Sequence, residues 1–432
     1  MSSPRNLLLV THLSPYPPSH GTELRISKLL KGLRSEGYRV VLVLCQEPAK
    51  KEHLEELLKF VEAVHWVRPA WRTRLGQRLP GLRQLLWENA KTLLKPQWIP
   101  RDIPRSAKLY DPVPSTVGDE NKKRDAIPSQ LPVLVARLAR RYKALAVIAE
   151  YIFLTDCFAL LEPGVLKIVD TIDVFSLREK QVVSYGIADD PWNSTPEEER
   201  AYLLRADVIV AIQEKEAEVL RTLVPERPVL TVGIDFDVDN SAGVPNDTDT
   251  VTMVASGTPL NIHGLNTFFA ECWPAIKSAH PPATLRIVGT IATNCKIQDE
   301  AVDYVAWTDD LRDVYRQSKV VINPTLAGTG LKVKSVEALA HGKPLVAWPN
   351  GVEGLDYQGA PPYLKCKSWK EFAAAVVRIL QSDSEARLLG DRALEYAKEK
   401  FDRTAIYLPL SACLKAHESA CERAIPSAAQ RS

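Results

Sequence analysis

Long hydrophobic runs are absent from this chain of 432 residues. No segment approaches the ~18–20 consecutive apolar residues of a membrane-spanning helix, and no signal-peptide pattern precedes the first predicted strand. The seven cysteines have neither CxxC nor zinc-type spacing, and their odd number argues against a complete disulfide framework. We therefore expect a cytoplasmic protein.

The composition is otherwise that of an ordinary globular protein, with 45% apolar and 25% charged residues. A chain of this length is too long for one hydrophobic core and suggests two or three domains. The formal net charge of +2 hides an asymmetry between the basic segment 68–108 and the rest of the chain.

The segment 320–355 carries the most informative pattern of the sequence. Its β-branched run at 320–322 predicts a buried strand, and Gly328 and Gly330 allow the following loop to approach a ligand closely. A helix is expected from Leu331 to His341, because glycine and proline follow.

Two lysines fall in the first turn of this predicted helix. Lys332 and Lys334 would each be unfavourable there by about 0.3–1 kcal/mol, because a helix N-terminus is already positive. A phosphate bound by the glycine loop and the helix N-terminus would remove that penalty. The pattern therefore predicts a phosphate site.

Glu337 follows about one turn after Lys334. Its carboxylate could accept hydrogen bonds from two adjacent hydroxyls, as a ribose presents them. The alternative is a surface ion pair with Lys334, worth a few tenths of a kcal/mol at about one-turn spacing.

The pattern GxGxKxKxxEAxAxGxPxV followed by GVEGL resembles the donor-binding signature of the large retaining family of nucleotide-sugar-dependent glycosyltransferases with the GT-B fold. The closest match is the subgroup with glycine and lysine where many relatives have an acidic residue. The resemblance implies an α/β chain of two Rossmann-like domains facing a central cleft, with the last helix crossing back to the first domain. It also implies transfer of a sugar from a nucleotide-diphosphate sugar without a metal or other cofactor.

Carried over to this sequence, the resemblance assigns the ribose to Glu337 and the pyrophosphate to Lys332 or Lys334. The donor-binding residues implied are Gly21, Gly257, His263, Gly328, Thr329, Gly330, Leu331, Lys332, Lys334, Glu337, Gly351 and Val352. The family's sugar-contacting glutamate has no counterpart, because Ala327 and Thr329 occupy the candidate positions. The arginine and lysine of the family's GRxxxxKG pattern are Thr258 and His263 here.

The N-terminal segment resembles the family's PxxGGxxxRxxxLxxxLxxxGHxV pattern, with a strand at 6–11 and a helix at 22–36. Gly21 and Arg25 match this pattern, while His20 replaces the first of its paired glycines. We expect His20 and Arg25 on the acceptor side of the cleft. Without the C-terminal match, the same loop would read as an ordinary strand–helix connection.

Two further predicted strands end in polar residues. Glu150 and Tyr151 follow the strand at 146–150, and Asp173 follows the strand at 166–170, where open α/β sheets place their ligands. We expect Glu150 and Tyr151 on the acceptor side, and Asp173 beside Lys332 and Lys334 as a catalytic group. The alternative for Asp173 is a turn cap.

Asp235, Asp237 and Asp239 also suggest a divalent-ion site, but they begin a polar stretch that reads as an interdomain linker. The GT-B resemblance implies that lysines and helix dipoles neutralise the departing diphosphate instead. We expect no catalytic metal.

The segment 68–108 contains ten basic residues against two acidic ones, together with three tryptophans among leucines. This composition suits a helix lying on the inner face of a membrane, where a lipid-linked acceptor would be found. The alternative is a helical insertion with solvated arginines or with arginines that hold an anionic acceptor. No nucleic-acid-binding motif accompanies the charge, so we expect no nucleic-acid partner.

Together these patterns predict an acceptor-binding domain at 1–238, a donor-binding domain at 239–400 and a returning helix at 401–432. The insertion at 68–108 and a proline-rich loop at 111–132 interrupt the first domain. The predicted function is transfer of a sugar to a glycan or lipid-linked acceptor in cell-surface polysaccharide or glycoconjugate synthesis. A catalytically silent scaffold subunit of a glycan assembly complex is the main alternative, and another GT-B chemistry such as sugar-nucleotide epimerisation is a third.

Overall fold

The computed structural model describes residues 5–18, 20–48, 50–67, 127–178, 193–239, 243, 248–295, 297–308 and 310–424. The predicted basic insertion 68–108 lies outside these residues, as does most of the predicted loop 111–132. The last two residues of that loop are helical, because a helix begins at Leu131. Among the described residues, no helix is long and apolar enough to cross a membrane.

The first domain is built on a parallel sheet of seven strands in the order β3-β2-β1-β4-β5-β6-β7. The strands are β1 (Asn6–Thr11), β2 (Arg39–Leu44), β3 (Ala63–Trp66), β4 (Ala146–Glu150), β5 (Leu166–Asp170), β6 (Val208–Ala211) and β7 (Val229–Thr231). Helices cover both faces, so the central strands are continuous apolar runs rather than alternating ones. These helices are α1 (Gly21–Ser35), α2 (Lys51–Leu57), α6 (Leu131–Tyr142), η1 (Ile152–Phe158), α8 (Pro196–Leu203) and α9 (Glu214–Leu223).

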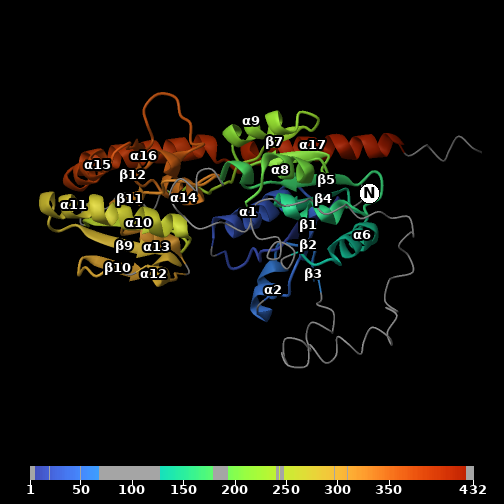
Figure 1. Ribbon diagram of the computed structural model, residues 1–432, viewed down its shortest axis with the longest axis horizontal. Coiled ribbons are helices and arrows are strands. Elements are labelled where there is room, and N and C mark those ends of the chain that lie inside the picture. Colours follow the sequence, from blue (N-terminus) through green and yellow to red (C-terminus); the bar gives the residue numbers. More distant parts are fainter. Residues whose placement is uncertain are drawn as a thin grey trace, which may run out of the picture.

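The second domain repeats this plan with six parallel strands in the order β10-β9-β8-β11-β12-β13. They are β8 (Thr250–Val254), β9 (Thr284–Val288), β10 (Val302–Val305), β11 (Val320–Asn323), β12 (Leu345–Ala347) and β13 (Leu364–Lys365). Its helices are α10 (Pro259–Glu271), α11 (Trp273–Ala279), α12 (Ile291–Asn294), α13 (Leu311–Arg316), α14 (Val333–Ala340), η3 (Pro349–Val352), α15 (Trp369–Gln381) and α16 (Asp383–Lys400). The prediction of two Rossmann-like parallel-sheet domains is therefore confirmed (Figure 1).

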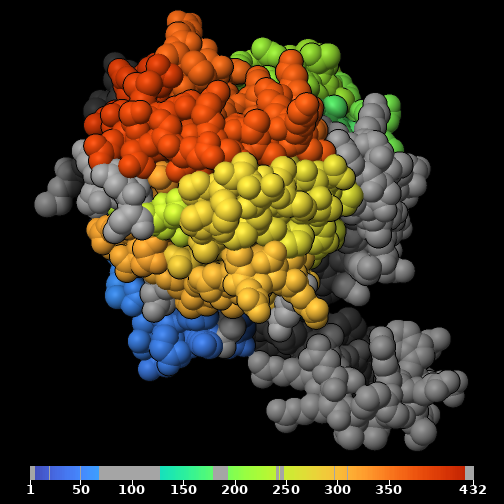
Figure 2. Space-filling model, turned by 90° about the vertical axis from the view of Figure 1, so that its left-hand side faces the viewer, coloured from blue at the N-terminus to red at the C-terminus, as the bar shows by residue number. Residues whose placement is uncertain are grey.

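Two consecutive helices of the second domain meet at a helix break. Helix α10 ends and α11 begins around Cys272. Pro274, in the first turn of α11, accounts for the break, because proline is tolerated at a helix start but not in its interior. Figure 2 shows the outer face of this domain, with α10 and α11 in yellow below the orange-red α15 and α16.

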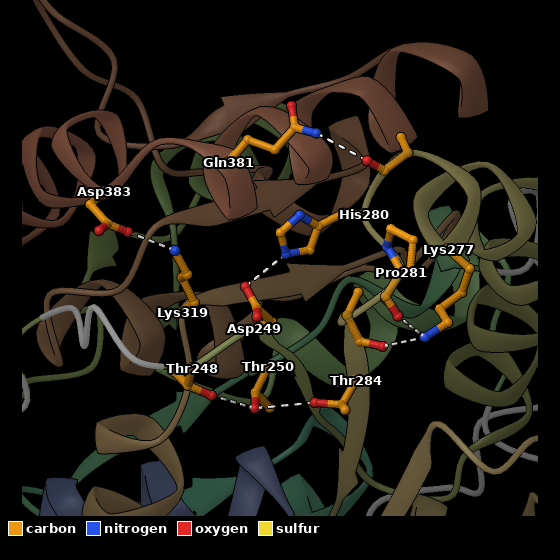
Figure 3. A network of polar contacts seen from close by, with 12 residues as sticks. Thr248, Asp249, Thr250, Lys277, His280, Pro281, Thr284, Lys319, Gln381 and Asp383 are labelled. Carbon is orange, nitrogen blue, oxygen red and sulfur yellow. Dashed lines mark hydrogen bonds and ion pairs between the residues drawn. The ribbon is translucent and has the colours of Figure 1, made fainter.

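Polar contacts join the amino ends of β8 and β9 (Figure 3). These ends lie at the edge of the sheet opposite the carboxyl ends of its strands. His280 Nε2 lies 2.7 Å from Asp249 Oδ1, just before β8, and Thr284 donates to Thr250 across the two strands. Lys319 forms an ion pair of 2.7 Å with Asp383 at the start of α16. These contacts stabilise the edge of the domain that carries no candidate site residue.

The last helix, α17 (Arg403–Ala424), leaves the second domain and runs across the first (Figure 1). Tyr407, Leu410 and Leu414 are buried in the core of the first domain. The Tyr407 ring lies where a side chain at Gly32 of α1 would collide with it, and its hydroxyl donates to Asp235 Oδ1 over 2.7 Å. Helix α17 therefore connects the end of the second domain back to the core of the first domain.

We expect Tyr407→Ala to lower the free energy of unfolding by about 3–5 kcal/mol, because it empties a packed site in the first domain and removes the partner of a buried carboxylate. Urea denaturation of the full chain measures this. Leu408→Ala is the matched control, since Leu408 is 61% exposed on the same helix and should change stability by at most about 0.5 kcal/mol. Equal stabilities for the two variants would show that α17 is not part of the first domain's core.

Candidate functional site

A cleft of about 980 Å³ lies between the two domains, at the carboxyl ends of both sheets. This is where open α/β sheets bind their ligands. Twelve of the residues predicted for the site line this cleft. They are His20, Gly21, Arg25, Tyr151 and Asp173 of the first domain and Gly328, Thr329, Gly330, Leu331, Lys332, Lys334 and Glu337 of the second. The predicted residues that do not line this cleft are Glu150, Gly257, His263, Gly351 and Val352.

The glycine loop, residues 326–332, connects β11 to α14 and forms the floor of the cleft. Gly328 and Gly330 have φ of 120° and 75°, a region that strongly favours glycine. A side chain at Gly330 would also lie 2.6 Å from Asp173 Oδ1, so the loop meets the first domain there at close range.

Lys332 holds the glycine loop in shape. Helix α14 begins at Val333, so Lys332 precedes it rather than lying in its first turn as predicted. The buried Lys332 ammonium donates to the carbonyl oxygens of Gly328, Thr329 and Gly330 over 2.9–3.0 Å. These three bonds use all three ammonium hydrogens, so Lys332 positions the loop rather than reaching a ligand.

Lys334, two residues further on, lines the cleft. It is half-buried, and its ammonium donates to Asn261 Oδ1 over 2.5 Å and to Thr325 Oγ1 over 2.8 Å. Burial, together with the charge of Lys332, lowers the pKa of Lys334 to about 7. No carboxylate among the described residues forms an ion pair with it, so the site lacks the counter-charge that a buried ammonium requires.

Glu337 lies on the same helix and lines the same cleft. Its Oε2 accepts a hydrogen bond of 3.2 Å from the Tyr315 hydroxyl, whose ring stacks on His341 with centroids 4.5 Å apart. Burial raises the pKa of Glu337 to about 7. The surface-pair alternative for Lys334 and Glu337 is wrong, because each side chain is held by other partners inside the protein.

Direct hydrogen bonds join the glycine loop to the first domain. The Thr329 hydroxyl donates to Asp173 Oδ1 over 3.1 Å, and the backbone N–H of Gly330 donates to Glu216 Oε1 of α9 over 2.6 Å. Burial and the nearby Asp173 raise the pKa of Glu216 to about 8, against the opposing effect of the Gly330 N–H. The closed arrangement of the domains therefore depends on this loop.

The acceptor side of the cleft has an aromatic wall. The Tyr151 ring stacks on Phe153 with centroids 5.2 Å apart, and its hydroxyl shares a hydrogen bond of 2.9 Å with Thr22. His20 immediately precedes α1, and its backbone N–H donates to Glu23 over 3.2 Å. Hydrogen bonding to Glu23 raises the pKa of His20.

Two residues predicted for the acceptor side belong to the core of the first domain. The Arg25 guanidinium is 1% exposed and is engaged by both carboxylate oxygens of Asp170 and by the Gly233 carbonyl. Glu150 is fully buried beside this pair, and burial and Asp170 raise its pKa well above the ordinary value. Arg25 therefore pairs inside the first domain at the margin of the cleft, whereas the Glu150 carboxylate is enclosed in the core without a hydrogen-bond partner among the described residues and does not line the cleft.

The predicted donor residues outside the cleft have structural environments. Gly257 donates its N–H to Thr290 Oγ1 over 2.9 Å, and a side chain there would collide with Asn294. The Gly351 carbonyl accepts bonds from Asn323 and Ser335, and Val352 lines a neighbouring cavity. His263 lies on α10, which brings Asn261 rather than His263 to the cleft.

Sequence reasoning missed four residues that hold the site: Glu216, Asn261, Tyr315 and Thr325. Nothing in the sequence separates Glu216 from Glu214 and Glu218 on the same helix.

Asp235, the first of the three aspartates considered for a metal site, accepts hydrogen bonds from Arg403 and Tyr407, which connects the start of the linker to α17. Asp237 lies near the same arginine.

Comparison with known families and structures agrees with this geometry. Residues 248–382 match the family described as "Glycosyl transferases group 1". No curated protein matches the sequence. Among solved structures, sucrose-phosphate synthase from Thermosynechococcus elongatus is 17% identical, with a TM-score of 0.62 over 96% of this chain and 100% of that one.

Two further structures have the same fold. HepE from Anabaena, in complex with UDP, is 15% identical with a TM-score of 0.62 over 95% of this chain and 100% of that one. The pneumococcal O-GlcNAc transferase GtfA, in complex with UDP and GlcNAc, is 12% identical with a TM-score of 0.62 over 96% and 99%. The predicted GT-B fold is confirmed, and the family match falls within the second domain.

Glu216 makes stability depend on pH. The folded-state pKa of Glu216 is about 8 and lies above the ordinary 4.5. Its contribution to the free energy of unfolding is therefore complete below pH 4.5 and is lost as the pH rises toward 8. We expect the parent to lose more free energy of unfolding than Glu216→Gln between pH 5 and 8, by up to about 1.4 kcal/mol per pH unit.

Denaturant unfolding at several pH values measures this difference. Glu218→Gln is the control, since Glu218 is exposed on the same helix and should leave the parent's pH dependence unchanged. If parent and Glu216→Gln lose stability in parallel, Glu216 is not the buried carboxyl described above.

Proposed function

We propose that the protein transfers a sugar from a nucleotide-diphosphate sugar to a glycan or lipid-linked acceptor. The observation that carries the proposal is the half-buried ammonium of Lys334, which faces the cleft and has only neutral oxygen partners. An ammonium so desolvated that its pKa falls to about 7 is strongly stabilised by an anion beside it. A diphosphate supplies that anion.

The nucleoside part of the donor is accommodated by the neighbouring groups. Glu337 lies one turn from Lys334 on the same face of α14, and its carboxylate can accept hydrogen bonds from a ribose diol. Trp307 lines the far part of the cleft and is 54% exposed, which leaves an aromatic surface for the base. UDP is present in the complexes of HepE and GtfA, which supports a nucleoside diphosphate here.

Charge growing on the leaving diphosphate would be stabilised by Lys334 and by the N-terminus of α14. These groups are fixed before the reaction, because Lys332 braces the loop that precedes the helix. Since they can neutralise the leaving group, we propose a reaction that uses neither a metal nor another cofactor. The family resemblance supports retention of anomeric configuration, and we assign no protein base.

Asp173 supplies a carboxylate where the family's sugar-contacting glutamate is missing. Thr329 occupies a candidate position for that glutamate, and its hydroxyl bonds Asp173 Oδ1 of the first domain. Asp173 is only 17% exposed and lines the cleft. We therefore assign to Asp173 the contact with the transferred sugar, which makes a productive site dependent on closure of the two domains.

The scaffold alternative rests on the missing sugar-contacting glutamate and on Thr258 and His263 in place of the family's arginine and lysine. It requires a protein without turnover, and the carboxylate that we assign to the sugar at Asp173 would offset only the first of these differences. The acceptor would enter past Tyr151 and His20, and contact with an inner membrane face through 68–108 remains a prediction about residues outside those described.

Thermal unfolding with UDP, GDP, ADP, CDP and dTDP tests the donor site. One diphosphate should stabilise the parent, by about 2.7 kcal/mol at 100 times its dissociation constant. Lys334→Met, which keeps the chain length without the charge, should lose the effect, whereas Lys398→Met on exposed α16 should keep it. Stabilisation by no diphosphate, or equal stabilisation of Lys334→Met, would contradict the proposal.

Asp173→Asn tests turnover separately from donor binding. The amide keeps an acceptor for Thr329 but removes the charge, so we expect kcat for sugar transfer, or for donor hydrolysis without acceptor, to fall about 10²–10³-fold. The stabilisation by nucleoside diphosphate should stay. Asp237→Asn, at a side chain 83% exposed, is the control. Unchanged kcat in Asp173→Asn would remove its assignment, and no turnover in the parent with any donor would favour the scaffold.

A further inference from the structure

A second cavity, of about 480 Å³, adjoins the cleft and shares Ala327 of the glycine loop with it. We call it the side pocket. It lies beyond the carboxyl ends of β12 and β13, which end at Ala347 and Lys365. It is therefore at the ligand-binding edge of the second sheet, past the part of the cleft that would hold the donor.

Three lysines give the side pocket its charge: Lys215, Lys365 and Lys367. Lys365 and Lys367 are both exposed and flank the buried Cys366, so they lie on one face of the extended chain. No carboxylate among the described residues forms an ion pair with any of the three lysines. Their ammonium groups are thus available to an anionic ligand.

One wall of the side pocket is an indole ring held in place. Trp348 stacks on Trp369 with ring centroids 4.5 Å apart and planes inclined by 22°. Its indole is half-buried and lines the pocket, and the apolar C–H face of a sugar ring can pack against it. The aromatic wall favours a saccharide over a small inorganic anion.

Polar acceptors complete the lining. Asp356 is exposed, and Glu353 accepts a hydrogen bond of 3.1 Å from Asn350, whose amide also donates to the Gly328 carbonyl over 2.9 Å. Carboxylates beside ammonium groups suit a ligand that carries both hydroxyls and a negative charge. The Asn350 amide also links this wall to the glycine loop.

Lys215 comes from the first domain, whereas the other lysines come from the second. Its neighbour Glu216 binds the Gly330 N–H, so the contact that closes the domains also brings Lys215 over the side pocket. The pocket is complete only in the closed arrangement.

We propose that the side pocket binds a carboxylate-bearing sugar residue, a hexuronate, of the acceptor. The carboxylate lies among Lys215, Lys365 and Lys367, and the ring packs on Trp348. The binding site stands on its own geometry, and only the identification of its ligand as part of an acceptor rests on the proposed function.

Saturation-transfer NMR and tryptophan fluorescence on the full chain test this with three probes: a glucuronate-containing trisaccharide, a neutral trisaccharide of the same length, and glucose 6-phosphate. The acidic trisaccharide should bind the parent roughly tenfold more tightly than the neutral one. The double variant Lys365→Gln/Lys367→Gln should abolish that difference. The double variant Lys370→Gln/Lys398→Gln, at exposed lysines outside the pocket, should keep it.

Equal affinity for acidic and neutral trisaccharides overturns the proposal, as does equal loss in the two double variants. Lysine-dependent binding of glucose 6-phosphate without binding of the glucuronate probe overturns the hexuronate assignment. Trp348→Phe should weaken the fluorescence response to the acidic probe, and the lysine variants keep the test valid if that variant does not fold.

The same samples separate this inference from the proposed function. Stabilisation by a nucleoside diphosphate should be equal in the parent and in Lys365→Gln/Lys367→Gln. If the diphosphate binds and the acidic probe does not, only the side-pocket inference fails. If the acidic probe binds in a lysine-dependent way and no diphosphate does, the side pocket stands and the donor site fails.

Discussion

The desolvation of two neighbouring lysines is the constraint on which the rest of the site depends. Lys332 and Lys334 flank the start of α14, where the helix end is already positive. The protein satisfies Lys332 with three loop carbonyls, and that fixes the loop that meets the first domain. Lys334 receives only neutral partners, so its ammonium is stabilised fully only when an anion enters the cleft.

Closure of the two domains follows from the same loop. The glycines at 328 and 330 let the backbone turn so that the Gly330 N–H reaches Glu216 and Thr329 reaches Asp173. Charges from both domains therefore surround one short segment. The returning helix α17 limits how far the domains can separate, because Tyr407 is packed in the first domain while α16 covers the second.

The fold could be predicted from sequence because the central strands are uninterrupted apolar runs. The predicted strands at 6–11, 146–150 and 166–170 coincide with β1, β4 and β5. On the donor side, the predicted residues Gly328, Gly330 and Lys334 do line the cleft, and their binding of a donor stays a prediction. On the acceptor side, the sequence did not show that Arg25 pairs with Asp170 inside the first domain or that Glu150 is buried beside this pair. The role of Glu216 could not be predicted from the sequence, since only the tertiary structure distinguishes a buried glutamate from exposed neighbours on one helix.

The most direct test of the account is the titration of Lys334 by NMR on lysine-labelled protein, with Lys334→Met to assign its signal. The account predicts a pKa near 7 in the free protein, because burial and Lys332 disfavour the charged form. Addition of the stabilising nucleoside diphosphate should raise that pKa, since the anion favours the ammonium. A free-protein pKa near the ordinary 10.5, or no change on adding the diphosphate, would contradict the claim that Lys334 is a desolvated cation awaiting an anionic ligand.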